Sequence, residues 1–471
     1  MVIEERADQT GRPVVEQHGI DIIPDSERHG TPRRLGLLWT GAILNVQMVT
    51  YGALLVYLGL NLWQALVAIA LGSLAWIFPA LASLVGPATG TTTFRAARAP
   101  FGVIGARVIT FCNFLMQLGY HMLALVLSLL AVKALVGLLG VTIAPPAEIV
   151  LILCFAALQA GLPILGYDAI SRALNALVIP FAVLFVALAW LAGGQFHIAV
   201  AAPAPWQVFL AGIALSLSAG GLGWSSNAAD FSRYLPRSTK PSRIVRAILV
   251  GGGVPQLLLL AMGVVIGNVA PNATDPIAGI AETLPHWFVA VYLVFVLVQT
   301  TTASSLSIYS CGVMMQAMGV RLRRWQAVVV ESVLATVLAC VVAFSAGFNE
   351  MVSLFLQSMM VWLAPWVAIT LLDYLRRRAD YSVSALSDRG PAWRTAGVTA
   401  QGIGMLVAFL ALHIGNYTGP LSALVGGVDL SIVAGLVVAA IVFLLMTRRA
   451  SSVEGPALPT AHLEHQGAHN A

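Results

Sequence analysis

Long apolar runs separated by short polar segments dominate this chain from residue 36 onward. Each run is long enough to cross a bilayer as a helix, which takes about 20 mostly apolar residues. Transmembrane β-strands are about half that length, and only helices or closed barrels satisfy their backbone hydrogen bonds in lipid. The pattern therefore predicts an all-α polytopic membrane protein.

Breaks at charged, proline and glycine clusters divide the apolar part into twelve predicted transmembrane helices. They cover residues 36–59, 62–86, 107–138, 147–166, 173–194, 206–229, 245–269, 286–318, 325–346, 349–375, 396–415 and 429–447. The third and eighth are long enough to be tilted or to extend beyond the bilayer. Residues 1–35 and 448–471 are predicted as polar tails, and His462, His465 and His469 in the second tail are expected to be solvated rather than metal-bound.

The distribution of positive charge supports this count of spans. With a cytoplasmic N-terminus, every lysine and arginine except Lys133 falls in a segment on the inner side of the membrane. Cytoplasmic loops are enriched in these residues, and one missing or extra span would reverse the alternation downstream of the error. We therefore expect an inner-membrane protein with both termini in the cytoplasm. No apolar segment typical of a cleavable signal peptide precedes the first span.

Composition narrows the class of protein further. Of the 471 residues, 59% are hydrophobic and 10% are charged, whereas soluble proteins carry about 25% charged residues. The basic residues lie between apolar spans, so the expected partner is the lipid bilayer and not a nucleic acid. The 4 cysteines all lie inside apolar runs, which favours neither a disulfide framework nor a metal centre.

Missing motifs exclude several kinds of membrane protein. The sequence contains no nucleotide-binding P-loop, no GxSxG hydrolase motif and no HExxH metalloprotease motif. An enzyme is therefore not expected, and a secondary transporter is the default reading of twelve spans. A non-transporting receptor is the alternative from another class, but the cytoplasmic segments are too short to hold an output domain.

Two predicted spans carry interruptions at corresponding positions. In transporters built from two inverted five-helix repeats, spans 1 and 6 correspond, and their helices are often broken at the binding site. Span 1 contains Asn45 and Gln47, and span 6 contains three glycines within residues 220–223, beside Trp224. Each glycine weakens a helix by about 1 kcal/mol relative to alanine. The pattern favours two broken helices, although small residues also serve close helix packing.

The inverted-repeat plan divides the chain into a first repeat at 36–195, a second at 206–375, and two extra spans at 396–447. Motifs spread over most of the chain agree with this plan. They are GIDIIPDSER at 19–28, GPATG at 86–90, RAPFG at 98–102, QLGY at 117–120, GWSSNAADFSRYLP at 223–236, SIYSCGV at 307–313 and QAMG at 316–319. In order and spacing they resemble the nucleobase:cation symporter-1 family, and within it the purine–cytosine permeases. The resemblance implies the leucine-transporter-type fold with two added C-terminal helices.

The resemblance also implies a site for a flat, neutral heterocycle between spans 1, 3, 6 and 8. Such a ring is bound by stacking on aromatic side chains, worth about 1–3 kcal/mol per base, and by amides or hydroxyls along its edge. The residues expected to contact it are Asn45, Gln117, Tyr120, Gly221, Trp224, Asn227, Ser304 and Ser307.

In span 3 the family carries a tryptophan followed four residues later by an amide, where this chain has Tyr120 and Ala124. The expected substrate is cytosine or a purine. Because of this departure, the alternatives are another heterocycle: allantoin, hydantoin, uracil or a ring-shaped vitamin. The expected activity is import of that small molecule with Na⁺ or H⁺, and no other cofactor is expected. No oligomeric state follows from the sequence.

The coupling ion has two groups of candidate residues. In sodium-dependent relatives, hydroxyls of span 8 and carbonyls of span 1 hold Na⁺, and the matching positions are Thr301, Thr302, Gly41 and Leu44. These hydroxyls belong to the polar run 299–307, which is expected to line the site, although such groups also bond to their own helix backbone.

His121 is the candidate for proton coupling because histidine titrates near neutral pH; the alternative is a structural, hydrogen-bonded histidine. Glu331 is expected near the cytoplasmic edge of span 9. Asp230 and Arg233 are expected either to form an inward gate or to solvate the end of span 6. The segment at 270–285, with Pro271, Asp275 and Pro276, is expected to cap the outer vestibule.

Overall fold

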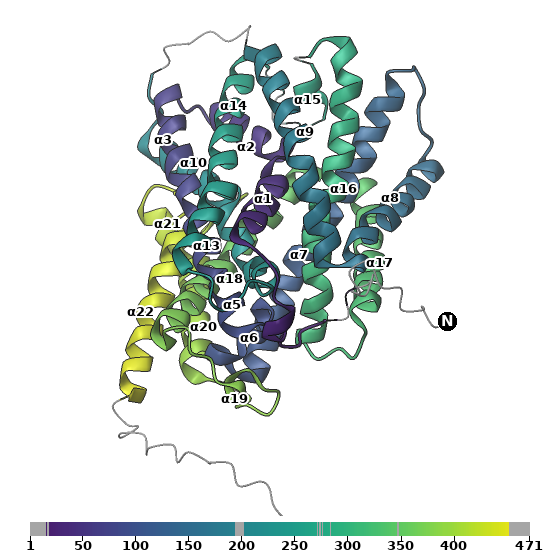
Figure 1. Cartoon of the computed structure of the whole chain (residues 1–471). Coiled ribbons are helices and arrows are strands. Elements are labelled where there is room, and N and C mark those ends of the chain that lie inside the picture. The colour runs from purple at the N-terminus through teal and green to yellow at the C-terminus, as the bar shows by residue number, and fades with distance from the viewer. Residues whose placement is uncertain are drawn as a thin grey trace, which may run out of the picture.

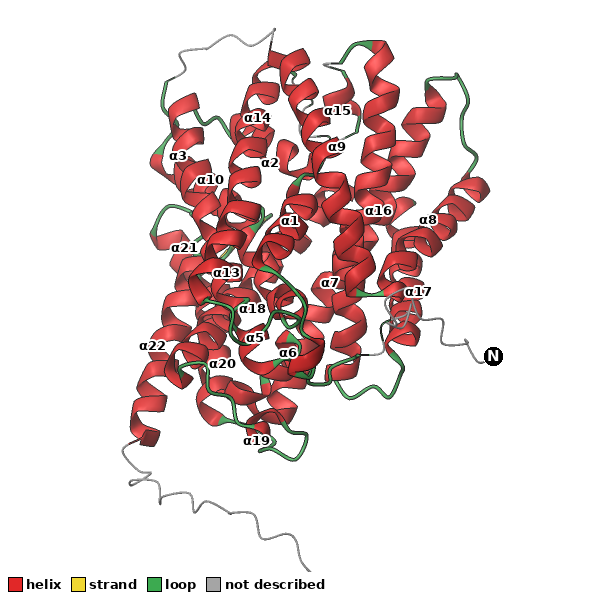
Figure 2. Ribbon diagram, in the orientation of Figure 1, coloured by secondary structure: helices red, strands yellow, loops and turns green. Residues whose placement is uncertain are grey.

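The computed structural model describes residues 16, 18–193, 202–270, 272, 275, 277–282, 284–345 and 348–451. Within this part of the chain, long helices run roughly side by side, and a single hairpin of β1 (His413–Ile414) and β2 (Tyr417–Thr418) connects two of them (Figures 1 and 2). The three tail histidines, Pro271 and Pro276 lie outside the described residues.

Twelve apolar segments match the twelve predicted spans. Ten helices are long and apolar enough to cross a membrane, and an eleventh span is the bent pair α1 (Pro32–Ile43) and α2 (Val46–Tyr57). The twelfth is the shorter apolar helix α20 (Thr395–Leu410). The all-α polytopic fold is therefore confirmed.

The elements follow one another in the predicted order. The first half contains the short η1 (Asp25–Glu27), the bent pair, α3 (Leu62–Ser73), η2 (Leu74–Trp76), α4 (Ile77–Ala82), α5 (Val85–Thr89), α6 (Thr93–Ala96), α7 (Arg98–Gly137), α8 (Pro145–Leu165) and α9 (Tyr167–Gly193). The second half contains α10 (Trp206–Ser218), α11 (Gly221–Trp224), η3 (Ser225–Asn227), α12 (Ala228–Ser232), α13 (Pro241–Ile248), the π-helical η4 (Leu249–Gly253), α14 (Val254–Val269), α15 (Ala278–Ala281), α16 (His286–Ala317), α17 (Arg324–Ala343) and α18 (Phe348–Arg377). The C-terminal part contains α19 (Val383–Leu386), α20, α21 (Pro420–Leu424) and α22 (Ser431–Ser451).

The first span breaks because Asn45 starts a new helix. Its side-chain oxygen accepts a hydrogen bond from the Met48 amide at 3.0 Å, and its amide nitrogen donates to the Ala42 carbonyl at 3.0 Å. Asparagine is among the best residues at a helix N-cap. The two halves, α1 and α2, are bent by 57° at this point.

The sixth span breaks at its glycines. Gly220 has φ −150° and ψ −80°, outside the helical region, and separates α10 from α11. The next residue, Gly221, lies against the backbone of η2, where an added Cβ would stand 2.5 Å from the Ala75 carbonyl carbon. Both predicted interruptions are thus confirmed as helix breaks.

The third span differs from its prediction at one end. Helix α7 begins at Arg98 rather than at residue 107, and it kinks at Gly102, where φ is +78°. Beyond the kink, the Val103 amide donates to the Pro391 carbonyl at 2.9 Å. A Cβ on Gly102 would lie 2.7 Å from that carbonyl oxygen, so the close approach of the loop before α20 requires glycine.

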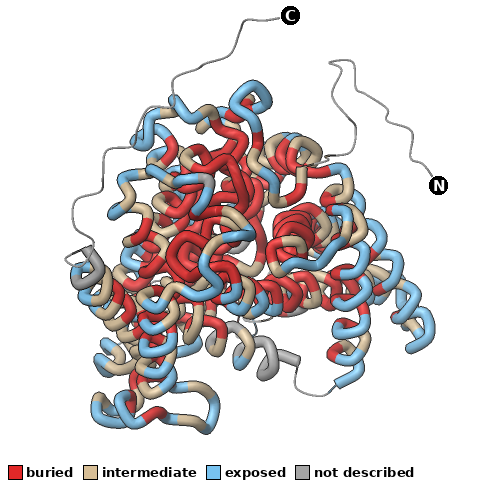
Figure 3. Tube along the Cα trace, turned by 90° about the horizontal axis from the view of Figure 1, so that it is seen from below, coloured by how far each residue is buried: buried red, intermediate tan, exposed pale blue. Residues whose placement is uncertain are grey.

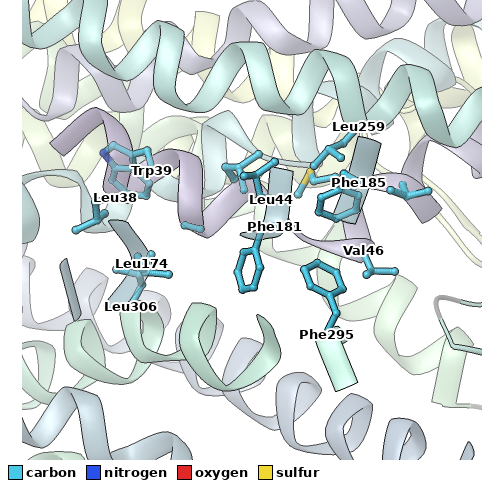
Figure 4. Close-up of a cluster of buried hydrophobic side chains, with 14 of the residues drawn as sticks. Leu38, Trp39, Leu44, Val46, Leu174, Phe181, Phe185, Leu259, Phe295 and Leu306 are labelled. Atoms are coloured by element: carbon cyan, nitrogen blue, oxygen red, sulfur yellow. The ribbon is translucent and has the colours of Figure 1, made fainter. Parts of the chain in front are cut away.

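Buried residues gather along the axis of the bundle and exposed residues at its rim (Figure 3). In one apolar cluster, side chains of the first broken span meet those of α9 and α16 (Figure 4). Here the Phe295 ring packs edge-on against Phe181 at 4.9 Å and Phe185 at 5.2 Å. Large apolar side chains also cover the rim, as Trp190 does on α9, and a bilayer satisfies such a surface where water does not.

Candidate substrate site

Both helix breaks open onto one cavity of about 140 Å³. Its walls come from α2, α7, the break between α10 and α11, α16, and Ile277 of the segment before α15. A cavity of roughly 150 Å³ engineered into another protein binds benzene. The volume is thus of the size that holds a small ring.

Aromatic side chains supply part of the wall. Trp224, at the end of α11, lines the cavity and packs against the Trp39 ring with centroids 5.5 Å apart. Tyr120 of α7 also lines it, and its ring is held edge-on by Phe355 at 6.3 Å. A Cβ added to Gly223 would lie 3.6 Å from the Tyr120 hydroxyl, so the two aromatic residues reach the cavity from neighbouring positions.

Gln117 is the polar group whose position is best fixed. It lies one turn before Tyr120 on α7, and its amide nitrogen donates to Asn227 Oδ1 at 2.5 Å and to Ser226 Oγ at 3.1 Å. Its carbonyl oxygen Oε1 is buried and has no hydrogen-bond partner within the described residues. Gln117 therefore connects α7 to the second broken span, and no described group donates to its carbonyl oxygen.

The wall formed by α16 is polar but uncharged. It consists of Val296, Gln299, Thr300, Ala303, Ser304 and Ser307. The Ser304 hydroxyl donates to the Thr301 carbonyl at 3.1 Å, which leaves its oxygen free to accept a further bond. No Asp, Glu, Lys or Arg is found among the residues that line the cavity, so the site suits a neutral polar molecule.

The structure brings most of the predicted contact residues together. Those that line the cavity are Asn45, Gln117, Tyr120, Trp224, Ser304 and Ser307. Gly221 packs on η2 instead, and its neighbours Gly220 and Gly223 line the cavity. Asn227 lies behind Gln117, as its hydrogen-bond acceptor.

Sequence reasoning missed part of the lining on α2. Gln47 and Tyr51 both face the cavity. They are four residues apart and therefore lie on one face of the helix that follows the Asn45 cap. That spacing is the signal that identifies them once the break at Asn45 is recognised.

Comparison with known proteins identifies the family. The model of the family described as "Permease for cytosine/purines, uracil, thiamine, allantoin" matches residues 22–447. The chain belongs to this permease family. Its members are multi-pass membrane transporters and not enzymes.

Individual relatives agree with this assignment. The permease is 27% identical over 463 residues to the putative purine-cytosine permease YxlA of Bacillus subtilis (strain 168), covering 92% of this chain and 96% of the relative. Its fold matches Mhp1, a nucleobase-cation-symport-1 family transporter in a closed conformation with bromovinylhydantoin bound. That match has a TM-score of 0.74 at 19% identity and covers 91% and 94% of the two chains.

The inward-facing conformation of Mhp1 matches with a TM-score of 0.72 at 18% identity, covering 93% of this chain and 96% of the other. A Na⁺-coupled sialic acid symporter matches with a TM-score of 0.59 at 12% identity, covering 94% of each chain. These likenesses show that the permease shares the fold of these transporters.

The positions expected to hold Na⁺ lie at the first helix break and on α16. In a continuous helix, the amides of Asn45 and Met48 would donate to the carbonyls of Gly41 and Leu44, four residues earlier. Here the Asn45 amide donates to the Ile43 carbonyl and the Met48 amide to the Asn45 side chain. No donor in the described part of the chain therefore bonds to the carbonyls of Gly41 and Leu44. The Thr302 hydroxyl donates to the Val298 carbonyl at 2.8 Å. The other hydroxyl in this set belongs to Thr301.

Carbonyl and hydroxyl oxygens are uncharged donors of the kind that a hard cation accepts. No cluster of His, Cys, Asp and Glu arranged to hold a metal ion occurs among the residues that the structure describes.

His121 of α7 is paired inside the membrane-spanning region. Its Nδ1 lies 2.9 Å from Oε1 and 3.1 Å from Oε2 of Glu331 on α17. Both side chains are completely buried. Glu331, which was expected near the cytoplasmic edge of span 9, thus forms a fully buried contact with α7 that the sequence did not predict.

Asp230 and Arg233 have separate partners. Asp230 accepts hydrogen bonds from the Thr93 amide and the Ser310 hydroxyl, both at 2.8 Å. Arg233 is fully buried and pairs with Glu16 at 3.0 Å. The structure thus shows neither of the two expected arrangements: both side chains are buried rather than solvated, and Arg233 pairs with the N-terminal segment instead of with Asp230.

Glu16 is the centre of this contact. It accepts hydrogen bonds from Arg233, from the Tyr234 hydroxyl, and from the Tyr309 hydroxyl at 2.9 Å. Burial raises the pKa of the Glu16 carboxyl, but the guanidiniums of Arg324 and Arg233 and the hydrogen bonds outweigh it and hold the pKa below its usual value. Glu16 therefore ties the end of the second broken span to α16.

Proposed function

We propose that this permease is a symporter that imports a nucleobase, such as cytosine or a purine, together with Na⁺ or H⁺. The observation that carries the proposal is the cavity between the two helix breaks. It combines aromatic rings with neutral amides and hydroxyls, and none of the described residues that line it is charged. A nucleobase has the complementary features, with two π faces and an uncharged edge of donors and acceptors. The alternative substrates are allantoin, hydantoin, uracil and a ring-shaped vitamin.

The contacts follow from the residues that line the cavity. The substrate ring stacks on Trp224 and Tyr120, and stacking of this kind is worth about 1–3 kcal/mol per base. Gln117 Oε1 accepts a hydrogen bond from the edge of the ring, since Gln117 lines the cavity and this buried acceptor has no partner among the described residues. Ser304 and Ser307 contact the opposite edge. Asn45 positions α2, because both ends of its amide are used at the helix break.

Transport then requires that the cavity open alternately to the two sides of the membrane. Broken helices around a midplane site are typical of transporters in which one helix bundle rocks against a scaffold. We assign spans 1, 2, 6 and 7 to the moving bundle. With both termini in the cytoplasm, the end of the molecule that carries the N-terminal segment, α5, α6 and α19 faces inward (Figure 1).

Two sets of groups are available for the coupling cation. The carbonyls of Gly41 and Leu44 with the hydroxyls of Thr301 and Thr302 would take Na⁺. The His121–Glu331 pair would take H⁺.

The test is uptake of labelled cytosine and hypoxanthine by cells that lack their own nucleobase carriers, with and without Na⁺ and with a protonophore. Expression of this permease should give accumulation that one of the bases competes, and the ion condition that abolishes it identifies the coupling ion. Unlabelled allantoin, hydantoin, uracil and thiamine serve as competitors for the alternatives. Failure to take up or bind any of these heterocycles would refute the proposal.

A further inference from the structure

The His121–Glu331 pair is an ionisable site that the substrate cavity does not use. The imidazole Nδ1 and the carboxylate are 2.9 Å apart, and neither side chain has any exposed surface. The two residues come from α7 and α17, which both span the membrane. The imidazole Nε2 is buried and has no hydrogen-bond partner in the part of the chain that the structure describes.

Stability alone does not account for such a pair. A buried ion pair is often no more stabilising than apolar residues of the same volume, because both groups lose their hydration. Ionisable residues within membrane spans are accordingly rare, and they usually mark the path of a transported ion or proton. The Nε2 atom without a described partner adds to the free-energy cost of burial. Apolar residues would therefore serve a purely structural role at least as well as this pair.

The position of the pair links it to the substrate site. Gln117 and His121 are four residues apart and so lie on one face of α7. Gln117 lines the cavity and bonds to Asn227 and Ser226 of the second broken span. The pair thus lies one helical turn from a contact between scaffold and moving bundle that must change when the cavity opens.

Among the residues that the structure describes, no further charged side chain forms an ion pair with His121 or Glu331. From α16, the Cys311 thiol is close enough to the carboxylate to feel its charge. On α17, the Ser332 hydroxyl lies 3.4 Å from Oε2 of Glu331. Within the described residues, no arginine or lysine forms an ion pair with either partner. The pair therefore carries one negative charge when the imidazole is neutral and the carboxyl ionised, and none after it gains one proton.

We propose that the His121–Glu331 pair is the site of the coupling proton, which makes this permease a proton symporter. One proton from the outer side binds to the pair, in addition to the imidazole proton that Nδ1 already shares with the carboxylate. It neutralises the pair and leaves to the inner side after the cavity has opened there. No covalent bond other than that to the proton forms or breaks. This assignment rests on the proposed function.

Coupling between two sites is reciprocal, so a proton that assists substrate binding must itself be bound more tightly when substrate is present. Couplings of this kind usually change an affinity by about 5- to 150-fold. Substrate affinity of the unmodified protein should therefore increase by such a factor when the pair gains its proton. Addition of substrate to the purified protein in weakly buffered solution should take up protons.

The decisive experiment compares two kinds of transport by reconstituted protein. Accumulation driven by an acid-outside pH gradient requires the proton to be bound and released, whereas counterflow exchanges labelled for unlabelled substrate without net proton movement. We expect Glu331→Gln to lose at least about 90% of the gradient-driven accumulation and to keep counterflow. This loss is on the order of tenfold, which lies in the lower part of the usual range of coupling between two sites. Its substrate affinity should no longer depend on pH.

The matched control is Glu148→Gln. Glu148 is also a buried carboxylate at the scaffold, paired with the half-exposed Lys133 at 2.6 Å between α7 and α8. The same acid-to-amide change there should leave both gradient-driven accumulation and counterflow in place.

Each other outcome has a definite meaning. Wild-type accumulation that follows a Na⁺ gradient and ignores the pH gradient would overturn the proton assignment and leave the proposed function intact, as would gradient-driven accumulation by Glu331→Gln at the wild-type level. Loss of counterflow together with accumulation in Glu331→Gln would identify the pair as structural. Absence of proton uptake on substrate binding by the unmodified protein would overturn the assignment without any variant. No counterflow of any heterocycle by the wild type would refute the proposed function instead.

Discussion

At the scale of single residues, Trp224 offers the most direct test of the substrate site. Its ring lines the cavity and is braced by Trp39 at 5.5 Å. Because ring stacking is worth about 1–3 kcal/mol, Trp224→Ala should weaken substrate binding by about 5- to 150-fold. Isothermal titration on the purified protein measures this change.

The control for that prediction is Trp190→Ala on the outer face of α9, where the side chain is 83% exposed to the lipid side. It should leave the affinity unchanged, and Trp224→Phe should retain part of it. Equal loss from the Trp224 and Trp190 variants would show that the effect is not due to stacking in the cavity.

Ala124 tests how the cavity selects its substrate. It lines the wall on α7, one turn after Tyr120. A glutamine there adds an amide but fills part of a cavity of about 140 Å³, so two-ring bases should lose more than one-ring bases. We expect Ala124→Gln to raise the ratio of cytosine to hypoxanthine uptake, measured as kcat/KM for each.

Ala124→Leu separates size from hydrogen bonding, because it fills a similar volume without an amide. It should lower uptake of both bases, with the larger effect again on hypoxanthine. A Gln variant with an unchanged ratio would contradict the placement of the ring beside residue 124.

At the scale of elements, α2 and α14 pack too closely at Gly52 for any side chain at that position. A Cβ on Gly52 would lie 2.0 Å from the Leu260 carbonyl oxygen, which belongs to the backbone of α14 and cannot turn aside. Gly52→Ala should therefore push the helices apart and destabilise the protein by about 1–3 kcal/mol, the usual cost of overpacking. The midpoint of thermal unfolding in detergent measures the loss.

Gly402→Ala in α20 is the matched change, because nothing lies within 4 Å of the added Cβ. It should leave the midpoint unchanged or raise it slightly, since alanine favours helix over glycine by about 1 kcal/mol. A Gly52 variant as stable as the Gly402 variant would mean that α2 and α14 separate without cost.

The elements themselves were predictable because their causes are local. Apolar runs of bilayer length define the spans, and the Asn45 cap and the glycines at 220–223 define the two breaks. The structure keeps all of these, with the largest shift at the start of the third span. The kink at Gly102 was not predictable, since it depends on a loop at residues 391–392 that is remote in sequence. The partners of His121 and Arg233 were missed for the same reason.

At the scale of the whole molecule, the N-terminal segment joins the bundle that we propose to move during transport to the rest of the protein. Glu16 bonds to Arg233 at the end of the second broken span and to Tyr309 of α16, while the Arg324 guanidinium of α17 donates to the Glu16 backbone carbonyl at 3.3 Å. Farther along, the Gly30 amide donates to the Tyr234 carbonyl at 2.8 Å. The segment therefore holds the moving bundle against the scaffold at the end of the molecule that we assign to the cytoplasm.

Ionisation of Glu16 maintains this closure. A carboxyl whose pKa is lowered in the folded protein contributes stability that is present above its usual pKa and is lost as the pH falls through the lowered value. The closure should therefore not respond to pH between about 5 and 8, where model carboxyls with pKa about 4.3 are already ionised. Glu16→Gln removes the charge at every pH and should favour the state that is open to the cytoplasm.

Labelling of a cysteine in the cavity measures that shift. The reporter is Ser307→Cys in a cysteine-free background, labelled from the cytoplasmic side with a membrane-impermeant maleimide. Adding Glu16→Gln should make this cysteine react faster. The rate should rise by about tenfold for each 1.4 kcal/mol by which the closed state is weakened. Glu27→Gln is the matched control, because Glu27 is an exposed carboxylate of the same segment that pairs only with His18 among the described residues. If both variants label at the rate of the Ser307→Cys parent, the segment covers the bundle without holding it closed. If Glu16→Gln instead labels more slowly, the Glu16 contacts stabilise the open state, and the direction of the gate is the reverse of the one argued here.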